Sequence, residues 1–228
     1  MTAFNIKIVS DNVCPYCYLG KVRLDRAIAQ FRRDSSPSSP DTFNISWHAY
    51  MLDPSAPEGV SEPVQVTTAR KFGPARAAAM QQRLRQVGAA EGLDFTFAGR
   101  RGSTRDSHRV VQLAKAKAKA KAIAGDGDVE DRVVHEIMKM YFEAGGDVTA
   151  EEDLVRAAAR AGVDAEETRA WLRGGKGGGE VDREVEEAYE MGVTGVPHFI
   201  INDKFEVHGA EDVSVFLKQL NKAREAAA

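Results

Sequence analysis

The chain has 228 residues, which is enough for one large domain or two small ones with a sizeable core. With 43% hydrophobic and 29% charged residues, its composition is ordinary for a soluble globular protein. The net charge of -3 gives no bulk attraction to nucleic acid or to an anionic membrane, and no apolar run approaches the ~20 residues that span a bilayer. We therefore expect neither a nucleic-acid-binding protein nor a membrane protein.

The first residues, MTAFNIKIVSDN, lack the basic start, the long apolar stretch and the small-residue cleavage site of a secretory signal. We therefore expect a cytoplasmic protein; no interface can be read from the sequence, so a monomer and a homodimer both remain open. Structural disulfides are rare in a reducing cytosol, so a close cysteine pair is expected to bind metal or to act in catalysis.

An α/β unit is predicted at the start of the chain. Residues 4–9 alternate apolar and polar side chains and predict a strand, and an apolar stripe at helical spacing runs from Leu19 to Phe31. The segment 34–41, rich in serine and proline, predicts a loop, and residues 43–49 alternate again. Strand, helix and strand in this order indicate a parallel βαβ unit with a crossover helix.

The middle of the chain, residues 66–172, shows little alternation and many helix signals. Thr149 with Glu152, and Asp164 with Glu167, have the spacing of capping boxes at helix starts. We predict a mainly helical lobe inserted into the α/β domain.

Two low-complexity segments lie in this part of the chain. AKAKAKAKA at 114–122 predicts a solvated surface helix, because alanine favours helix and the lysines fall on opposite faces. GGKGGG at 174–179 lacks the Ser/Thr ending and the preceding strand of a phosphate-binding loop, and it predicts a flexible connector.

The α/β pattern returns near the C-terminal end. An amphipathic helix is expected to end at Gly192. Two short strands, 198–201 and 204–208, are joined through Asn202 and Asp203, which is typical of a hairpin. Apolar residues at helical spacing predict a last helix beyond it.

Every cysteine of the chain lies in the segment SDNVCPYCYLGK. A disulfide between Cys14 and Cys17 would close too short a loop to add much stability, because the stabilisation grows with loop length. A zinc or iron–sulfur site needs about four ligands. The 5 histidines show no close pair in sequence, although folding could gather two of them. Redox chemistry fits the pair best.

The position of the pair between a strand and a helix indicates how it would act. Pro15 suits the first position of a helix, so Cys14 would lie at the helix N-terminus. Free amides and the helix dipole there lower the pKa of a thiol from about 8.5. Cys17 lies nearly one turn further, ~5–6 Å away and within disulfide range. Cys14 would attack a substrate disulfide, and Cys17 would resolve the mixed disulfide.

The segment GVP at 195–197 directly precedes a predicted strand and is the candidate for the other half of the site. Val196–Pro197 is predicted to be a cis peptide that faces the thiols, with the backbone of Val196 free to pair with an extended substrate. The alternative is an ordinary proline at the entry of a strand.

With these features in order, the sequence resembles the thioredoxin superfamily and, within it, the DsbA-like group that includes FrnE-type oxidoreductases. The resemblance rests on SDNVCPYCYLGK at 10–21, STRDSHR at 103–109, YFEAGGDVT at 141–149, GVTGVPHFIIND at 192–203 and VHGAED at 207–212. It implies an α/β thioredoxin fold (βαβ … ββα) with a large helical insertion. The thioredoxin-like domain would comprise residues 1–60 and 180–228, and the inserted helical domain residues 61–179.

The resemblance implies a thiol:disulfide oxidoreductase of the DsbA-like kind. Cys14 would be its nucleophile and Cys17 its resolving thiol. Pro15 and Tyr16 between them would tune the reduction potential, because a change in thiolate stability changes the potential of the couple.

Three further residues are expected near this site. Asp11 precedes the active-site turn and would either help proton transfer to Cys17 or serve only the turn. His198 directly follows Pro197, and His108 lies on a helix that is expected to face the cleft. For each histidine, a structural role and a contact with substrate are both open.

Relatives of 2-hydroxychromene-2-carboxylate isomerase and of the glutathione transferase kappa class share this architecture and bind glutathione, usually with serine in place of the first cysteine. A glutathione-dependent isomerase or a kappa-class-like transferase is therefore the alternative function. In those relatives the segment after the last strand holds the γ-glutamyl group, which implies Asp212, together with Val196, as glutathione-binding residues. We expect a disulfide-containing peptide or small molecule as substrate, glutathione as the candidate co-substrate, and neither a tightly bound cofactor nor a metal.

Overall fold

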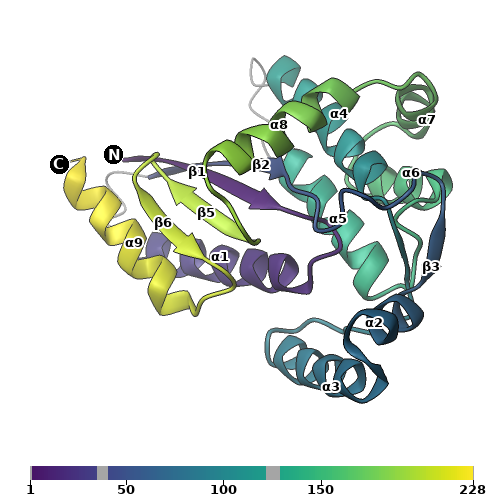
Figure 1. The fold of residues 1–228 in the computed structure, drawn as a ribbon. Helices are drawn as coiled ribbons and strands as arrows, with labels where there is room; N and C mark the ends of the chain where they lie inside the picture. The colour runs from purple at the N-terminus through teal and green to yellow at the C-terminus, as the bar shows by residue number, and fades with distance from the viewer. Residues whose placement is uncertain (1, 35–40, 122–128, 228) are drawn as a thin grey trace.

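The computed structural model of the protein describes residues 2–34, 41–121 and 129–227. Its centre is a four-stranded sheet in the order β2-β1-β5-β6 (Figure 1). Strands β1 and β2 are parallel, whereas β5 is antiparallel to both β1 and β6. The strands are β1 (Ala3–Ser10), β2 (Thr42–Ala49), β5 (His198–Ile201) and β6 (Phe205–His208).

Between β2 and β5 the chain forms a mainly helical insertion, as the sequence predicts. Its elements are β3 (Ser61–Pro63), α2 (Val64–Phe72), α3 (Pro74–Ala90), β4 (Arg100–Gly102), α4 (Arg105–Lys121), α5 (Val129–Phe142), α6 (Glu151–Arg160), α7 (Ala165–Arg173) and α8 (Gly178–Glu190). Helix α5 packs between α4 and α6. The small antiparallel sheet of β3 and β4 was not predicted, because each strand is only 3 residues long and shows no alternation.

The parallel βαβ unit and the C-terminal hairpin are both confirmed. Helix α1 (Pro15–Asp34) connects β1 to β2, and α9 (Val213–Ala226) follows the hairpin. The hairpin turns at Asn202 and Asp203, whose φ angles of 51° and 54° lie in the left-handed region that these residue types tolerate. Residues 35–40 of the predicted Ser/Pro loop lie outside the described residues.

Successive side chains of β5 point to opposite faces of the sheet, and their contacts show which helix covers each face. Phe199 is fully buried and meets Phe216 of α9 edge to face, with ring centroids 4.9 Å apart. Its neighbour His198 points to the opposite face together with its register partner Val9 of β1, which packs with Ala188 of α8. Helices α1 and α9 therefore lie on one face of the sheet, and α8 covers part of the other (Figure 1).

One cluster of buried apolar side chains joins the sheet to the inserted helices. It includes Ile8 and Leu19 from the βαβ unit as well as Val133 and Leu154 from the insertion. The insertion therefore shares a core with the sheet, and the boundaries of two separate domains stay a prediction.

Of the two predicted capping boxes, one supplies an N-cap and the other is wrong. The Asp164 carboxylate accepts a hydrogen bond from the Glu167 amide (2.8 Å) at the start of α7. Helix α6 has Ala150 as its N-cap residue and no side-chain cap. Thr149 does not cap α6, because its hydroxyl donates a hydrogen bond to the Asp147 carboxylate (2.8 Å).

The two low-complexity segments also differ from expectation. The lysine–alanine segment is helical as far as it is described, but it is not wholly solvated, because Ala114 is fully buried and Lys115 pairs with Glu184 of α8. In the glycine-rich segment, Gly178 and Gly179 form the start of α8 rather than a flexible connector. Packing of α8 against α4 orders this segment.

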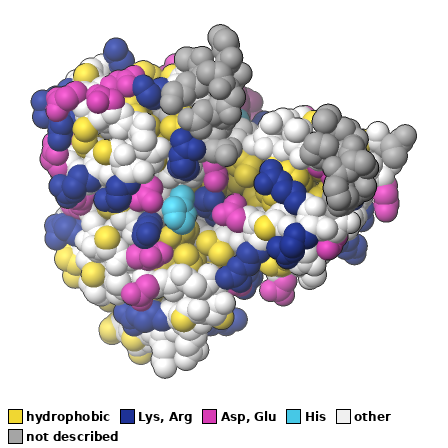
Figure 2. Space-filling view, turned by 180° about the vertical axis from the view of Figure 1, so that it is seen from behind, with side chains coloured by type: hydrophobic (Ala, Val, Ile, Leu, Met, Phe, Trp, Pro, Cys, Tyr) yellow, Lys and Arg dark blue, Asp and Glu magenta, His cyan; other side chains and the backbone are white. Residues whose placement is uncertain are grey.

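The surface carries charges of both signs. On the face in Figure 2, lysine and arginine side chains are interspersed with aspartate and glutamate rather than gathered into a patch of one sign. This distribution agrees with the small net charge of the chain. Among the described residues, none of the helices has the length and apolar character needed to cross a membrane.

Candidate active site

The first cysteine occupies the start of a helix, as the sequence predicts. Helix α1 begins at Pro15, and the Cys14 carbonyl oxygen accepts hydrogen bonds from the amides of Cys17 (3.0 Å) and Tyr18 (3.4 Å). Cys14 is therefore the N-cap residue, at the positive end of the helix dipole. Its own amide donates to the Asp11 carbonyl oxygen (3.0 Å), which closes the turn between β1 and α1.

The two thiols differ in pKa. Both are free, Cys17 is fully buried, and Cys14 keeps 4% of its surface exposed. A hydrogen bond from the Cys17 side chain lowers the pKa of Cys14, and amides of the helix add to this effect, against burial and the charge of Asp11. Burial, followed by the hydrogen bond and charge of Cys14, raises the pKa of Cys17. Cys14 therefore ionises first, and the thiolate is the nucleophilic form.

The loop before β5 faces the first thiol. The Val196–Pro197 peptide bond is cis, as predicted, and the Cys14 thiol donates to the Val196 carbonyl oxygen at 3.5 Å. The Pro197 carbonyl oxygen accepts a hydrogen bond from the Gly209 amide (2.8 Å), which ties this loop to the end of β6. Among the described residues, the Val196 amide has no backbone partner, so it is available to a bound chain.

A residue that the sequence analysis missed allows α1 to approach this loop. Gly20 is buried, and a Cβ added there would lie 2.9 Å from Phe199 Cζ and 3.1 Å from Pro197 Cγ. A larger side chain would therefore push against Pro197, the residue after Val196, whose carbonyl oxygen accepts a hydrogen bond from Cys14. A glycine inside a regular helix was the signal of this close approach in the sequence.

Asp11 and His108 lie close together at the turn that precedes Cys14, although they are distant in sequence. The buried Asp11 carboxylate accepts a hydrogen bond from the Leu52 amide (2.8 Å), and it lies 3.6 Å from Nε2 of His108. The same nitrogen lies 3.1 Å from the Tyr50 carbonyl oxygen. His108 thus joins α4 of the insertion to the turn before Cys14. A part for Asp11 in proton transfer stays a prediction.

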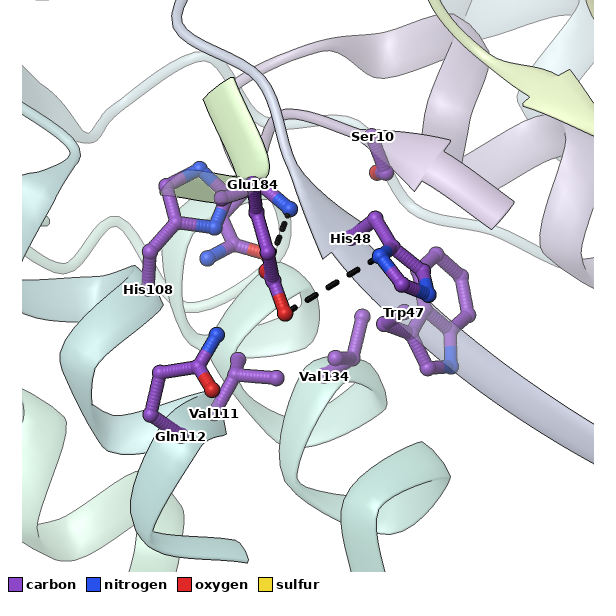
Figure 3. A pocket seen from close by; sticks show the side chains of 10 residues that line it. Ser10, Trp47, His48, His108, Val111, Gln112, Val134 and Glu184 are labelled. Carbon is purple, nitrogen blue, oxygen red and sulfur yellow. Dashed lines mark hydrogen bonds and ion pairs between the residues drawn. The ribbon is translucent and has the colours of Figure 1, made fainter. Parts of the chain in front are cut away.

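A small polar cavity lies beside this pair. Figure 3 shows Glu184 of α8 and His48 of β2 pointing toward one another across it, with Gln112 of α4 on the other side. Burial, and then the positive charge of Lys115, lowers the pKa of His48 to about 4, so its imidazole is neutral. Among the described residues, Ser10 Oγ and Gln112 Nε2 are buried here without a hydrogen-bond partner. Groups of this kind are the usual partners of buried water.

Of the remaining predicted residues, Pro15 and Tyr16 lie between the two cysteines, and Asp212 lies at the start of α9. Pro15 is the first residue of α1, and Tyr16 beside it has 49% of its surface exposed. Asp212 is the N-cap residue of α9, and its exposed carboxylate lies 3.7 Å from the guanidinium of Arg23 on α1. Tyr16 is thus the most accessible side chain of the CPYC segment.

The fold brings His198 to Glu206 rather than to the thiols. Its imidazole lies on the sheet face opposite α1, with Nε2 3.1 Å from a carboxylate oxygen of Glu206. His208, its register partner, brings a second imidazole to the same carboxylate. Within the described residues, these three form the one cluster of side chains suited to holding a metal ion, and neither cysteine belongs to it.

Comparisons with known proteins agree with the resemblance seen in the sequence. Residues 5–221 match the model of the DsbA-like thioredoxin domain. A probable DsbA oxidoreductase from Streptomyces coelicolor has a similar structure, with a TM-score of 0.82 and 30% identity over 97% of this chain and 90% of that one. Comparison with curated protein sequences gave no match.

Two further solved structures share the fold at low identity. One is a 2-hydroxychromene-2-carboxylate isomerase, with a TM-score of 0.63 and 16% identity over 98% of each chain. The other is the cytosolic disulfide reductase DsbM from Pseudomonas aeruginosa, with a TM-score of 0.56 and 16% identity over 98% of this chain and 96% of that one.

The family match and the thioredoxin fold with its helical insertion thus agree over nearly the whole length of the sequence. The chain belongs to the DsbA-like thioredoxin domain family, and it is an oxidoreductase of that family.

Proposed function

We propose that the protein exchanges disulfides with Cys14 as the nucleophile and Cys17 as the resolving thiol. The observation that carries this proposal is the opposite perturbation of the two thiols. A hydrogen bond from Cys17 lowers the pKa of Cys14, whereas burial raises the pKa of Cys17. One sulfur is ready to attack while the other stays protonated until the mixed disulfide has formed.

The reaction proceeds in two exchanges. The Cys14 thiolate attacks one sulfur of the substrate disulfide, and the other sulfur leaves as a thiolate that takes up a proton. Cys17 then loses its proton and attacks the Cys14 sulfur, which releases the second substrate thiol and leaves a Cys14–Cys17 disulfide. The substrate gains two electrons and the protein loses two, and the reverse sequence oxidises a dithiol substrate.

The loop before β5 is the proposed wall of the substrate groove. The Val196 carbonyl oxygen lies 3.5 Å from Cys14 Sγ, and the amide of the same residue is unpaired among the described residues. An extended peptide or a small disulfide can pair with this backbone beside the nucleophile. We assign Tyr16, which is half exposed, to contact with the substrate, and Asp11 and His108 to support of the active-site turn.

Glutathione is the proposed small-molecule partner. The exposed carboxylate of Asp212 beside the guanidinium of Arg23 suits the ammonium and carboxylate of a γ-glutamyl group. The segment that leads to Asp212 begins at Gly209. The Gly209 amide donates a hydrogen bond to the Pro197 carbonyl oxygen, which holds this segment next to the loop that faces Cys14. DsbM has also been solved with GSH, in a structure with a TM-score of 0.54 to this chain. We also propose a cytoplasmic location, which suits glutathione as the partner. Disulfide exchange by the two cysteines needs no tightly bound cofactor.

Separate replacement of the two cysteines tests the proposal. Cys14→Ser should abolish reduction of a model disulfide, because a serine hydroxyl is not ionised near neutral pH and cannot form the mixed disulfide. Cys17→Ser should accumulate a mixed disulfide at Cys14 that is visible by mass spectrometry. If Cys14→Ser retained most of its turnover with glutathione, the alternative of a glutathione-dependent isomerase or kappa-class-like transferase would replace disulfide exchange.

A further inference from the structure

We propose that His198, Glu206 and His208 bind one divalent transition-metal ion on the β5–β6 hairpin. Nε2 of each histidine lies 3.1 Å from the same atom, Oε2 of Glu206. The three donor atoms all lie within 4.8 Å of one another. Ligands of a tetrahedral zinc ion, with bonds of ~2.0–2.2 Å, lie about 3.3–3.6 Å apart. The donors therefore stand close to the spacing that such an ion needs.

The sheet gathers these donors before any ion binds. His198 and His208 are register partners on antiparallel strands, so their side chains share one face. Glu206 lies two positions before His208 on the same strand and therefore projects from that face as well. No rearrangement of the backbone is needed to bring the three side chains together.

The donor types select the class of metal. Two imidazole nitrogens and one carboxylate oxygen suit Zn²⁺, Co²⁺ and Ni²⁺, whereas Mg²⁺ and Ca²⁺ prefer oxygen ligands. The cluster contains no sulfur, and its His198 imidazole projects from the face of the sheet opposite α1, the helix that begins after Cys14. The proposed metal site is therefore separate from the cysteine pair.

The surroundings leave room for the rest of a coordination shell. A hollow of about 430 Å³, bounded by residues 192–198, His208 and Gly209, adjoins the donors. In Figure 1 no described helix lies in front of the β5–β6 hairpin on the face opposite α1. Water or a small anion can therefore take the remaining position. Three protein ligands and one open position are typical of catalytic rather than structural zinc sites.

A titration without competing thiols tests the site. In a Cys14→Ser/Cys17→Ser variant, calorimetric titration with Zn²⁺ should show one ion per chain, and an excess of Mg²⁺ should not displace it. In that background, His208→Ala and Glu206→Gln each remove an exposed ligand. Each should weaken zinc binding at least about tenfold, because even changes outside the ligand shell cost about 10–100-fold.

Matched controls separate a site from weak surface binding. Glu211→Gln removes an exposed carboxylate of the following segment and should leave the zinc affinity unchanged. The imidazole NMR signals of His198 and His208 should shift with Zn²⁺, whereas those of buried His48 should not. Absence of one-to-one binding, or equal affinity in His208→Ala and its parent, would overturn the proposal. Because the redox pair is absent from every protein in the titration, the result is independent of the proposed function.

Discussion

Replacement of Gly20 by alanine should displace the loop that faces the nucleophile. The new Cβ would lie 2.9 Å from Phe199 Cζ and 3.1 Å from Pro197 Cγ, whereas ordinary contacts begin at 3.4 Å. The phenyl ring would have to move by about 0.5 Å and the proline ring by about 0.3 Å to reach that distance. Phe199 is fully buried against Phe216, so it has no free space to enter.

Two opposing effects set the change in stability. Alanine inside a helix is favoured over glycine by ~0.8–1.0 kcal/mol. Overpacking of a filled core costs about 1–3 kcal/mol, which leaves a net loss in unfolding free energy of up to about 2 kcal/mol. Gly179→Ala is the matched control, because its Cβ would meet only Arg183 at 3.9 Å. That variant should gain stability, so the two should differ by about 1–3 kcal/mol.

Urea unfolding measures the stability of both variants, and stopped-flow reduction of glutathione disulfide measures the rate of exchange. Gly20→Ala should slow exchange by about tenfold, because a misplacement of about 1 Å at a reacting centre can cost about 10²-fold. Gly179→Ala should exchange at the wild-type rate. If Gly20→Ala were as stable as Gly179→Ala and equally fast, the close approach of α1 to Pro197 would have no consequence, and the reasoning would be wrong.

Three other variants test separate parts of the structure. Burial raises the pKa of Glu130 from 4.5 to about 7, so folding favours its neutral form, and its contribution to stability is lost as the pH rises through 7. Between about pH 4 and pH 8 the wild type should therefore lose up to about 3 kcal/mol of unfolding free energy relative to Glu130→Gln, and parallel pH profiles would contradict this. Asp164→Ala removes the N-cap of α7 and should cost about 1 kcal/mol in urea unfolding; an unchanged midpoint would show that the cap does not matter. The charge of Asp11 raises the pKa of Cys14, so Asp11→Asn should speed alkylation of Cys14 by iodoacetamide at mildly acidic pH, and slower alkylation would refute the assigned sign.

Local patterns were enough to predict the parts of the site that lie within one segment. The place of Cys14 before Pro15 depends on the preference of proline for the first turn of a helix, and the structure confirms it. The hairpin through Asn202 and Asp203 follows in the same way from the backbone angles that these residues tolerate. Where two local preferences compete, prediction fails: the Thr149 hydroxyl bonds to Asp147 and does not cap α6.

Contacts between distant segments could not be predicted, because they depend on how helices and strands pack. His108 reaches Asp11 only because α4 packs beside the turn that follows β1. The pairing of β5 with β6 brings His198 and His208 together, although the sequence shows no close histidine pair. A glycine inside a helix indicates a close approach at Gly20, but only the folded structure shows that Phe199 and Pro197 are the residues it approaches.

Reversible oxidation of Cys14 and Cys17 to a disulfide is the property on which the proposed function depends. It can be followed by titrating the protein in glutathione buffers of defined potential, with free thiols alkylated and counted by mass spectrometry. We expect a single two-electron transition between two free thiols and a Cys14–Cys17 disulfide, with no persistent glutathione adduct. A protein that formed no internal disulfide at any potential, and bound glutathione without oxidising or reducing it, would rule out disulfide exchange by this pair.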